Sequence, residues 1–360
     1  MSESGNSRHA EASMVAKSLL YLAAFVIVIA GLREAQELIV PFLLSGFIAI
    51  IAAPVLFWLR SRGLPGWLAL TVALAGVVVV GVLVSALIGG SIHDFARDLP
   101  AYQARLSTLY QNVLGQFETW GIGALDGDIA AMFDPRAAIG FAGSLFNSLG
   151  GTLANTFLIL LTVLFLLAEA TVMEAKLRAI SMDPDRLMTH VESVFKEVNR
   201  YIAIKTLTSL GTGLAVALWL WALGVDYAAL WGLLAFLLNF VPNIGSVIAA
   251  APALLLALVQ LGVGSAVWAG IGFLVINVVV GNVLEPRYMG RSLGLSGLVV
   301  FLSLVFWGWV LGMVGMFLSV PLTITLKIIM SADPRTAWAA VLLGGGKDIE
   351  ESVDKGSPSA

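Results

Sequence analysis

Residues 227–259, YAALWGLLAFLLNFVPNIGSVIAAAPALLLALV, form a stretch of 33 residues without a charged side chain. As one helix this stretch would be about 50 Å long, whereas the hydrocarbon core of a bilayer is about 30 Å thick. Two crossings would need about 40 residues. The middle of the stretch contains Asn239, Pro242, Asn243 and Gly245, and these residue types interrupt helices or favour turns. The stretch therefore predicts a broken helix inside a membrane.

Residues 298–330 show the same anomaly, because they form a second apolar stretch of 33 residues with small residues at Gly308, Gly312 and Gly315. In one interpretation, each stretch is a single long, kinked span, which gives eight plain spans. In the other, each is a re-entrant pair of half-helices, the first entering from outside and the second from the cytoplasm. Two broken helices of opposite orientation are typical of secondary transporters, whose sites contain unwound backbone near mid-membrane.

The composition of the whole chain supports a membrane location. Hydrophobic residues make up 59% of the 360 residues and charged residues 12%, about half the share in an average soluble domain. Between residues 206 and 326 the charged side chains are Asp226, Glu285, Arg287 and Arg291. Lipid is the solvent that accommodates such a stretch, so we expect an all-α integral membrane protein with about eight membrane segments.

The apolar runs and the polar intervals between them predict an order of segments along the chain. Pro100 is expected to begin a helix in the first polar interval, and Asp183-Pro184 to begin one in the second. We expect a disordered cytoplasmic tail (1–13), three spans (14–92, the first over Met14–Leu32), an extracytoplasmic helical domain (93–147), a fourth span (148–168), a cytoplasmic amphipathic segment (169–200), a transport core (201–330) and a cytoplasmic tail (331–360).

Basic residues predict the orientation, because cytoplasmic loops are enriched in lysine and arginine. Arg60 and Arg62 follow the second span, and a larger basic group follows the fourth: Lys176, Arg178, Arg186, Lys196, Arg200 and Lys205. Both termini are therefore expected in the cytoplasm, in a plasma membrane of bacterial type. The re-entrant interpretation also returns Arg287 and Arg291 to the cytoplasmic side, whereas eight plain spans place both outside.

Glu285 is the one acidic residue between residues 227 and 330. Ionisable groups at membrane depth are rare and are candidates for substrate or ion pathways. The structural alternative is that Glu285 lies at the interface and pairs with Arg287 or Arg291. Pro286 disfavours helical geometry at Glu285, which suits either a loop or a binding corner. If transport is coupled to protons, Glu285 is the expected titrating group.

Other residues of the apolar core are candidates for the same pathway. Asn239 and Asn243 flank Pro242 and either bind a polar substrate or satisfy backbone groups freed by the break. Asn277 and Asn282 suit hydrogen bonds between helices as well as a substrate role. The full pathway set is Asn239, Pro242, Asn243, Gly245, Asn277, Asn282, Glu285, Pro286 and Arg287, and the expected hinge or packing positions are Gly308, Gly312, Gly315 and Pro321.

The sequence argues against several other classes of function. It contains no cysteine, its three histidines are isolated, and we expect neither a metal nor a cofactor. The formal net charge of -3 does not favour nucleic acid. Neither a hydrolase motif nor a P-loop is present, so we expect no enzyme and no ATP-driven pump within this chain.

Three blocks of the C-terminal half resemble the autoinducer-2 exporter (AI-2E) family, a permease-like family. They are Leu223–Ala228 continuing through Asn239–Gly245 to Ala250–Ala253, then Asn282–Leu295, and then Gly312–Leu322. Order and spacing agree across roughly residues 200–330, and the N-terminal spans agree in layout. One departure is Asn239, where family members often carry an acidic residue. A mechanism that needs a titratable carboxylate at this position is therefore not expected here.

The resemblance implies a transporter of small molecules or ions in the cell membrane. Family members export the quorum-sensing signal autoinducer-2, and others exchange monovalent cations for protons. It also implies a homo-oligomer, such as a pentamer. We therefore expect a secondary transporter that exports a small polar molecule, with a cation/proton antiporter as the alternative. A third hypothesis, from another class, is a membrane scaffold whose 93–147 domain binds an extracytoplasmic partner.

Overall fold

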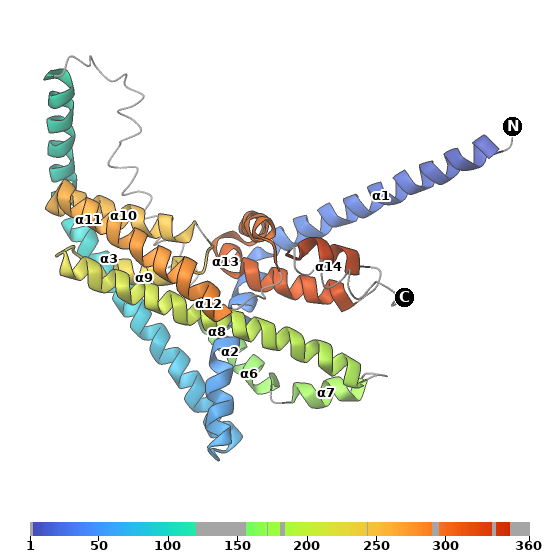
Figure 1. Ribbon diagram of the computed structural model, residues 1–360. Helices are drawn as coiled ribbons and strands as arrows, with labels where there is room; N and C mark the ends of the chain where they lie inside the picture. The colour runs from blue at the N-terminus through green and yellow to red at the C-terminus, as the bar shows by residue number, and fades with distance from the viewer. Residues whose placement is uncertain are drawn as a thin grey trace.

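The computed structural model describes residues 3–119, 156–170, 172–180, 184–242, 244–289, 295–332 and 336–345. Every regular element within these ranges is a helix, which confirms the expected all-α class (Figure 1). Asn243 and Arg291 lie outside the described residues.

The N-terminal half contains three long helices and two shorter ones. Their bounds are α1 (Glu3–Glu34), α2 (Gln36–Ser61), α3 (Gly66–Thr119), α6 (Thr156–Ala170) and α7 (Met173–Ile180). α1 projects away from the other helices, and near its C-terminal end Ile29 and Leu32 pack against Val310 and Leu311 (Figure 1).

The C-terminal half contains α8 (Pro184–Ala222), α9 (Ala228–Leu238), α10 (Gly245–Leu261), α11 (Val263–Asn277), a π-helix η1 (Val278–Leu284), α12 (Glu285–Met289), α13 (Gly297–Ala332) and α14 (Ala337–Leu343). Pro184 is the first residue of α8, as expected for a first-turn proline.

Five helical segments are long and apolar enough to cross a bilayer, and three shorter apolar helices accompany them. The long segments are Gln36–Ser61, Gly66–Phe95, Phe195–Ala222, Val263–Leu284 and Gly297–Ser331, and the shorter helices are α6, α9 and α10. α1 contains the predicted first span, Met14–Leu32, but it is not among the five. The chain is therefore a multi-pass helical membrane protein, and the count of about eight segments stays a prediction.

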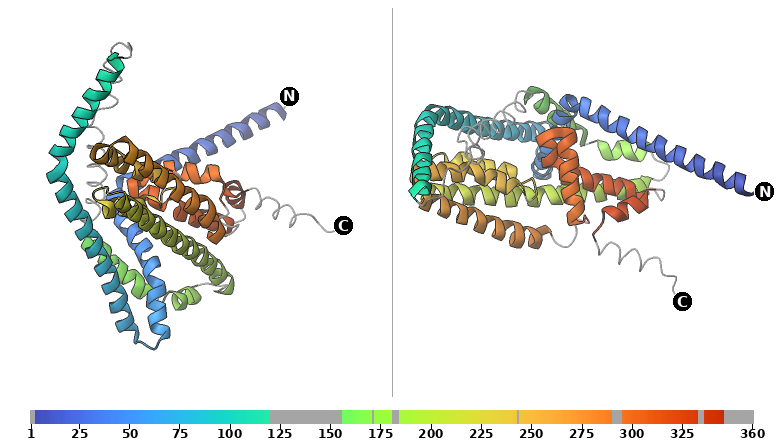
Figure 2. Two further views of the ribbon diagram at one scale, coloured as in Figure 1. Left: turned by 60° about the vertical axis from the view of Figure 1, so that its left-hand side comes forward. Right: turned by 90° about the horizontal axis from the view of Figure 1, so that it is seen from above.

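α3 is one continuous helix of 54 residues with Pro100 inside it, so the prediction that Pro100 begins a helix was wrong. The part of α3 that follows its apolar segment Gly66–Phe95 is called the outer part of α3 here. α3 bends along its length, and this part lies across the ends of α9 and α10 (Figure 2). A proline is tolerated inside a helix at a bend where water reaches the carbonyl group that loses its hydrogen bond. Pro100 is exposed and lies beyond the apolar segment Gly66–Phe95, so the hydrogen bond that it removes lies outside that segment.

The first 33-residue stretch forms a hairpin of two helices, called hairpin 1 here (α9, the turn 239–244 and α10). Gln260, near the end of α10, accepts a hydrogen bond from the backbone N–H of Asp226 at 2.9 Å and donates to the carbonyl of Gly224 at 3.1 Å. A straight helix would separate residues 226 and 260 by about 51 Å. The two ends of hairpin 1 therefore lie side by side, and a single kinked span was the wrong interpretation of this stretch.

The second stretch, called hairpin 2 here (α13), is interrupted at Gly312, whose φ of 66° and ψ of -150° are essentially restricted to glycine. The Trp307 indole donates to the Thr323 hydroxyl at 3.1 Å, although a straight helix would place these residues about 24 Å apart. A Cβ atom on Gly315 would overlap the carbonyl oxygen of Trp307. These contacts confirm the predicted break and show that the chain folds back on itself.

Small residues allow α8 and α9 to pack closely. A Cβ atom on Gly213 would lie 2.7 Å from the carbonyl oxygen of Gly232, and one on Gly232 would lie 2.6 Å from the Cβ of Ala217. Close backbone contact at small residues is a common way to pack helices in membranes. This contact fixes hairpin 1 against α8, which carries the polar residues of the candidate site.

Candidate functional site

The break regions of the two hairpins meet at a cluster of phenylalanine rings. Phe240 follows α9 and its ring stacks on Phe317 of hairpin 2, with centroids 4.4 Å apart. Phe47 of α2 contacts both rings edge to face, at 5.7 Å and 5.0 Å, and Phe236 contacts Phe240 at 5.7 Å. The structure thus brings together two breaks that are more than 60 residues apart in the sequence.

A buried polar stripe on α8 faces this junction. Lys205, Thr208, Ser209 and Thr212 are buried although α8 is apolar in this part. Spacings of three, four and seven residues place them on one face of the helix. The Ser209 hydroxyl accepts a hydrogen bond from the Asn239 side-chain amide at 2.9 Å, which connects the stripe to the first break.

An ion pair lies one helical turn from Ser209. The Lys205 Nζ donates to Glu285 Oε1 at 2.7 Å, and the two side chains are only 6% and 18% exposed. Removing either charge would leave the other one buried without a partner, which is costly in an apolar environment. We call Lys205, Ser209, Asn239 and Glu285 the tip site, because Asn239 directly follows α9 at the tip of hairpin 1 and the adjacent Phe240 packs on Phe317 of hairpin 2.

One prediction about Glu285 was wrong, and another is tested only in part because Arg291 lies outside the described residues. Glu285 has helical φ and ψ angles of -58° and -51°, and its N–H bonds to the carbonyl of Val280, so Pro286 does not force it out of a helix. The wider turns of η1 shift the hydrogen-bond register directly before this proline. Among the described residues, the partner of Glu285 is Lys205, whereas Arg287 is exposed.

The remaining predicted residues are not part of the tip site. The Asn277 amide donates to the carbonyl of Phe273 in its own helix at 2.7 Å, so the expected bond between helices is absent from the described contacts of this residue. Asn282 is exposed. Pro242 lies between α9 and α10, and Gly245 is the first residue of α10. Gly308, Gly312, Gly315 and Pro321 lie in hairpin 2, and the placement of Asn243 is not described.

Lys205 is the residue of the candidate site that sequence analysis missed. We counted it with the cytoplasmic basic residues because it lies near the start of the fifth apolar run. The available signal was its spacing, since Lys205 is four residues before Ser209 and seven before Thr212 in an otherwise apolar helix. Such a polar stripe predicts a buried face that contacts other helices.

The tip site consists of groups that form hydrogen bonds, and it carries no net charge. Its groups are one amide, one hydroxyl, one ammonium group and one carboxylate, and the two charges cancel. Across the described ranges, no group of three acidic or histidine side chains could hold a metal ion. These four groups can donate and accept hydrogen bonds.

Comparison with known proteins places this architecture in a family. The family model "AI-2E family transporter" matches residues 22–335, a range that includes the whole tip site and both hairpins. The chain belongs to the AI-2E family of membrane transporters.

Relatives of this AI-2E family member are similar over nearly their whole length. A protein of Haemophilus influenzae is 42% identical over 340 residues, covering 93% of this chain and 98% of the relative. The Escherichia coli protein named AI-2 transport protein TqsA is 41% identical over 327 residues, covering 91% and 95%. The Escherichia coli protein YhhT is 38% identical over 332 residues, covering 91% and 94%.

Proposed function

We propose that this AI-2E family member is a secondary transporter that exports a small polar molecule of the autoinducer-2 type. The observation that carries the proposal is the ion pair between Lys205 and Glu285, buried between apolar helices beside two broken ones. Ionisable groups at membrane depth characteristically belong to transport pathways. The name of the relative TqsA, an AI-2 transport protein, supports the class of solute.

The arrangement of the two hairpins supports alternating access to the tip site. We propose that hairpin 1 enters the membrane from outside and hairpin 2 from the cytoplasm, so that their tips meet within the bilayer. Discontinuous helices that meet in this way form the sites of many secondary transporters. The ring cluster of Phe47, Phe240 and Phe317 would separate the two sides in the state described here.

The ion pair also favours the re-entrant topology over eight plain spans. Lys205 is expected near the cytoplasmic end of its span, whereas eight plain spans would place Glu285 outside. Two side chains on opposite faces of a membrane cannot form a contact of 2.7 Å. We therefore propose that Lys205 and Glu285 share the cytoplasmic half and that both termini are cytoplasmic. A homo-oligomer in the bacterial plasma membrane completes this proposal.

A monovalent cation/proton antiporter is the second candidate, and the same ion pair favours it. A carboxylate that exchanges its ammonium partner for a proton or a metal cation would couple the two fluxes. Asn239, the polar residue at the first break, is not titratable, so Glu285 would have to perform this exchange.

Transport by purified protein in proteoliposomes distinguishes these functions. We expect autoinducer-2 loaded into the vesicles to leave faster than from protein-free vesicles, without an imposed ion gradient. Sodium-dependent proton movement with no autoinducer-2 flux would instead identify an antiporter. An absence of all three fluxes from folded, reconstituted protein would contradict both and favour the scaffold hypothesis.

Cysteine labelling in intact cells tests the proposed topology, because the natural chain contains no cysteine. Val263 and Tyr288 are suitable positions, since both are exposed and they flank one continuous helical segment, α11 to α12. We expect Val263→Cys to react with a membrane-impermeant maleimide from outside and Tyr288→Cys to react only after permeabilisation. The reverse pattern would contradict the re-entrant topology. Gly262 is less suitable because its φ of 90° disfavours any other residue.

A further inference from the structure

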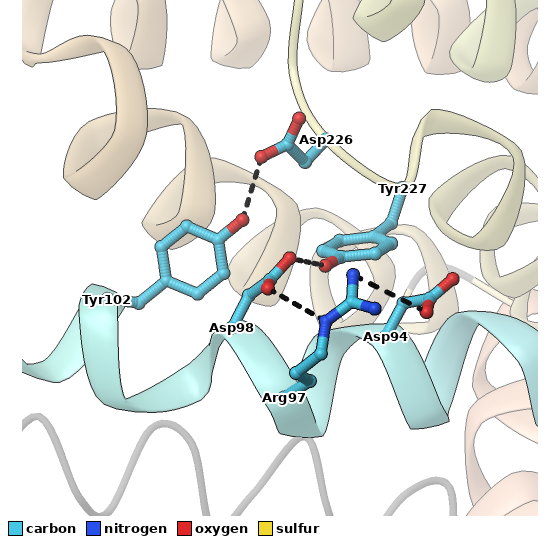
Figure 3. A network of polar contacts seen from close by, with 6 residues as sticks. All are labelled: Asp94, Arg97, Asp98, Tyr102, Asp226 and Tyr227. Carbon is cyan, nitrogen blue, oxygen red and sulfur yellow. Dashed lines mark hydrogen bonds and ion pairs between the residues drawn. The ribbon is translucent and has the colours of Figure 1, made fainter.

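A second polar network lies at the opposite end of hairpin 1, where the outer part of α3 meets the segment before α9 (Figure 3). The Tyr102 hydroxyl of α3 donates to Asp226 Oδ2 at 2.7 Å. In the other direction, the Tyr227 hydroxyl donates to Asp98 Oδ2 of α3 at 2.6 Å. Each element thus supplies one donor and one acceptor. Both bonds can form only when α3 and the segment before α9 are in one relative position, which we call the register of the two elements.

Aromatic contacts support this register. The Phe95 ring stacks on Tyr102 with centroids 6.1 Å apart and contacts the Tyr227 and Trp231 rings edge to face at 5.8 Å and 6.4 Å. Trp231 lies in the first turn of α9, and its indole donates to the carbonyl of Asp226 at 3.0 Å. The outer part of α3 is therefore attached to the start of α9 by both polar and apolar contacts.

The same network includes the other end of hairpin 1, because the N–H of Asp226 bonds to Gln260 near the end of α10. α3, α9 and α10 are thus held at one point. Tyr227 has a φ of 59° and a ψ of 29°, the left-handed region that L side chains with bulky rings rarely adopt. Such a conformation persists where the surrounding contacts impose it, and it is common at segments that move.

We propose that Asp98, Tyr102, Asp226 and Tyr227 form an external latch that holds hairpin 1 to α3 and opens during each transport cycle. The inference rests on the transport function proposed above and adds the element that controls hairpin 1. α9 is a rigid helix of 11 residues between the latch and Asn239. Movement at the latch is therefore transmitted along the helix to Asn239, about 18 Å away.

We do not expect titration of Asp98 or Tyr227 to open the latch at physiological pH. The bond from Tyr227 holds the pKa of Asp98 below its ordinary value, so its contribution is present above about pH 4 and is lost as the pH falls further. Burial and the bond to Asp98 raise the pKa of Tyr227 to about 12, so that contribution persists until the pH rises above about 10. Burial and the bond to Asp226 also raise the pKa of Tyr102. The neighbouring charges are Arg97, 3.5 Å from Asp98, and Asp94, 3.7 Å from Arg97.

Reversible cross-linking tests the latch. In the double variant Asp98→Cys/Tyr227→Cys, a bis-methanethiosulfonate linker joins α3 to the segment before α9. We expect the linked full-length protein to lose autoinducer-2 flux in proteoliposomes and to regain it when a reductant cleaves the linker. In the matched control Asp94→Cys/Asp98→Cys the same linker joins two residues of α3, and we expect it to leave flux at the unlinked rate. Flux through linked Asp98→Cys/Tyr227→Cys at its unlinked rate would overturn the proposal.

A measurement without any cargo separates the latch from the proposed transport function. Spin labels at Arg105→Cys of α3 and Leu261→Cys at the end of α10, both exposed, report the separation of α3 and hairpin 1 by pulsed electron paramagnetic resonance. Tyr102→Phe/Tyr227→Phe keeps the rings and removes both hydroxyl donors, and we expect it to add a second, longer distance. Tyr21→Phe, an exposed tyrosine of α1, is expected to keep one distance. An unchanged distribution in the double variant would contradict the latch even if no cargo is transported.

Discussion

Replacement of Glu285 by alanine is expected to destabilise the protein strongly and to abolish flux. The change leaves the Lys205 side chain, which is only 6% exposed, without its carboxylate partner. Breaking a buried ion pair from one side costs about 3–5 kcal/mol. The melting temperature of the detergent-purified protein and autoinducer-2 flux in proteoliposomes measure the two effects.

Two further variants separate stability from transport. Arg287→Ala removes an exposed charge two residues later, and we expect both measurements to stay at the level of the natural protein. Lys205→Met/Glu285→Met removes both charges, and we expect most of the stability to return, because an apolar pair of similar volume often replaces a buried ion pair. Flux should remain absent in this variant. A double variant that transports at the natural rate would contradict a role of the pair in the pathway.

The second large effect is expected at Gly315 of hairpin 2. A Cβ atom at this position would overlap the carbonyl oxygen of Trp307 and lie 2.7 Å from the Cβ of Leu311. Because backbone atoms cannot move away as side chains do, Gly315→Ala should force the two halves of the hairpin apart. Overpacking in a well-packed region costs about 1–3 kcal/mol. We expect a lower melting temperature and a loss of flux.

Two other glycines of α13 provide a graded control. A Cβ atom on Gly308 would meet the flexible side chain of Met316 at 2.7 Å, so Gly308→Ala should have a smaller effect than Gly315→Ala. Gly297 has no other atom within 4 Å of that position, so Gly297→Ala should be neutral or stabilise the helix by up to about 1 kcal/mol. Equal melting temperatures for all three variants would contradict the close contact within hairpin 2.

The length of an apolar stretch was the most informative sequence feature of the fold. Residues 227–259 and 298–330 do not match the thickness of a bilayer, and the structure shows a hairpin in each. The break at Gly312 was predictable because glycine tolerates a positive φ. Pro100 was misinterpreted, since a proline at a helix start and one inside an exposed part of a helix have the same local sequence.

The tip site was only partly predictable, because its partners are distant in the sequence. Asn239 and Glu285 were identified from their polarity inside apolar stretches. Lys205 lies 80 residues before Glu285, and no local pattern reports which carboxylate a lysine contacts. Its position near the start of a span is equally typical of a lysine that faces the cytoplasm. The same limit applies to the pairing of Asp98 with Tyr227, which lie 129 residues apart.

The ion pair between Lys205 and Glu285 has a consequence for the response to voltage. A single charge that crosses the membrane field gains or loses about 2.3 kcal/mol for each 100 mV of potential. The ammonium group and the carboxylate are 2.7 Å apart and together form a dipole with no net charge. If the pair moves as a unit, export of a neutral solute draws no current, and its direction follows the concentration of the solute on the two sides.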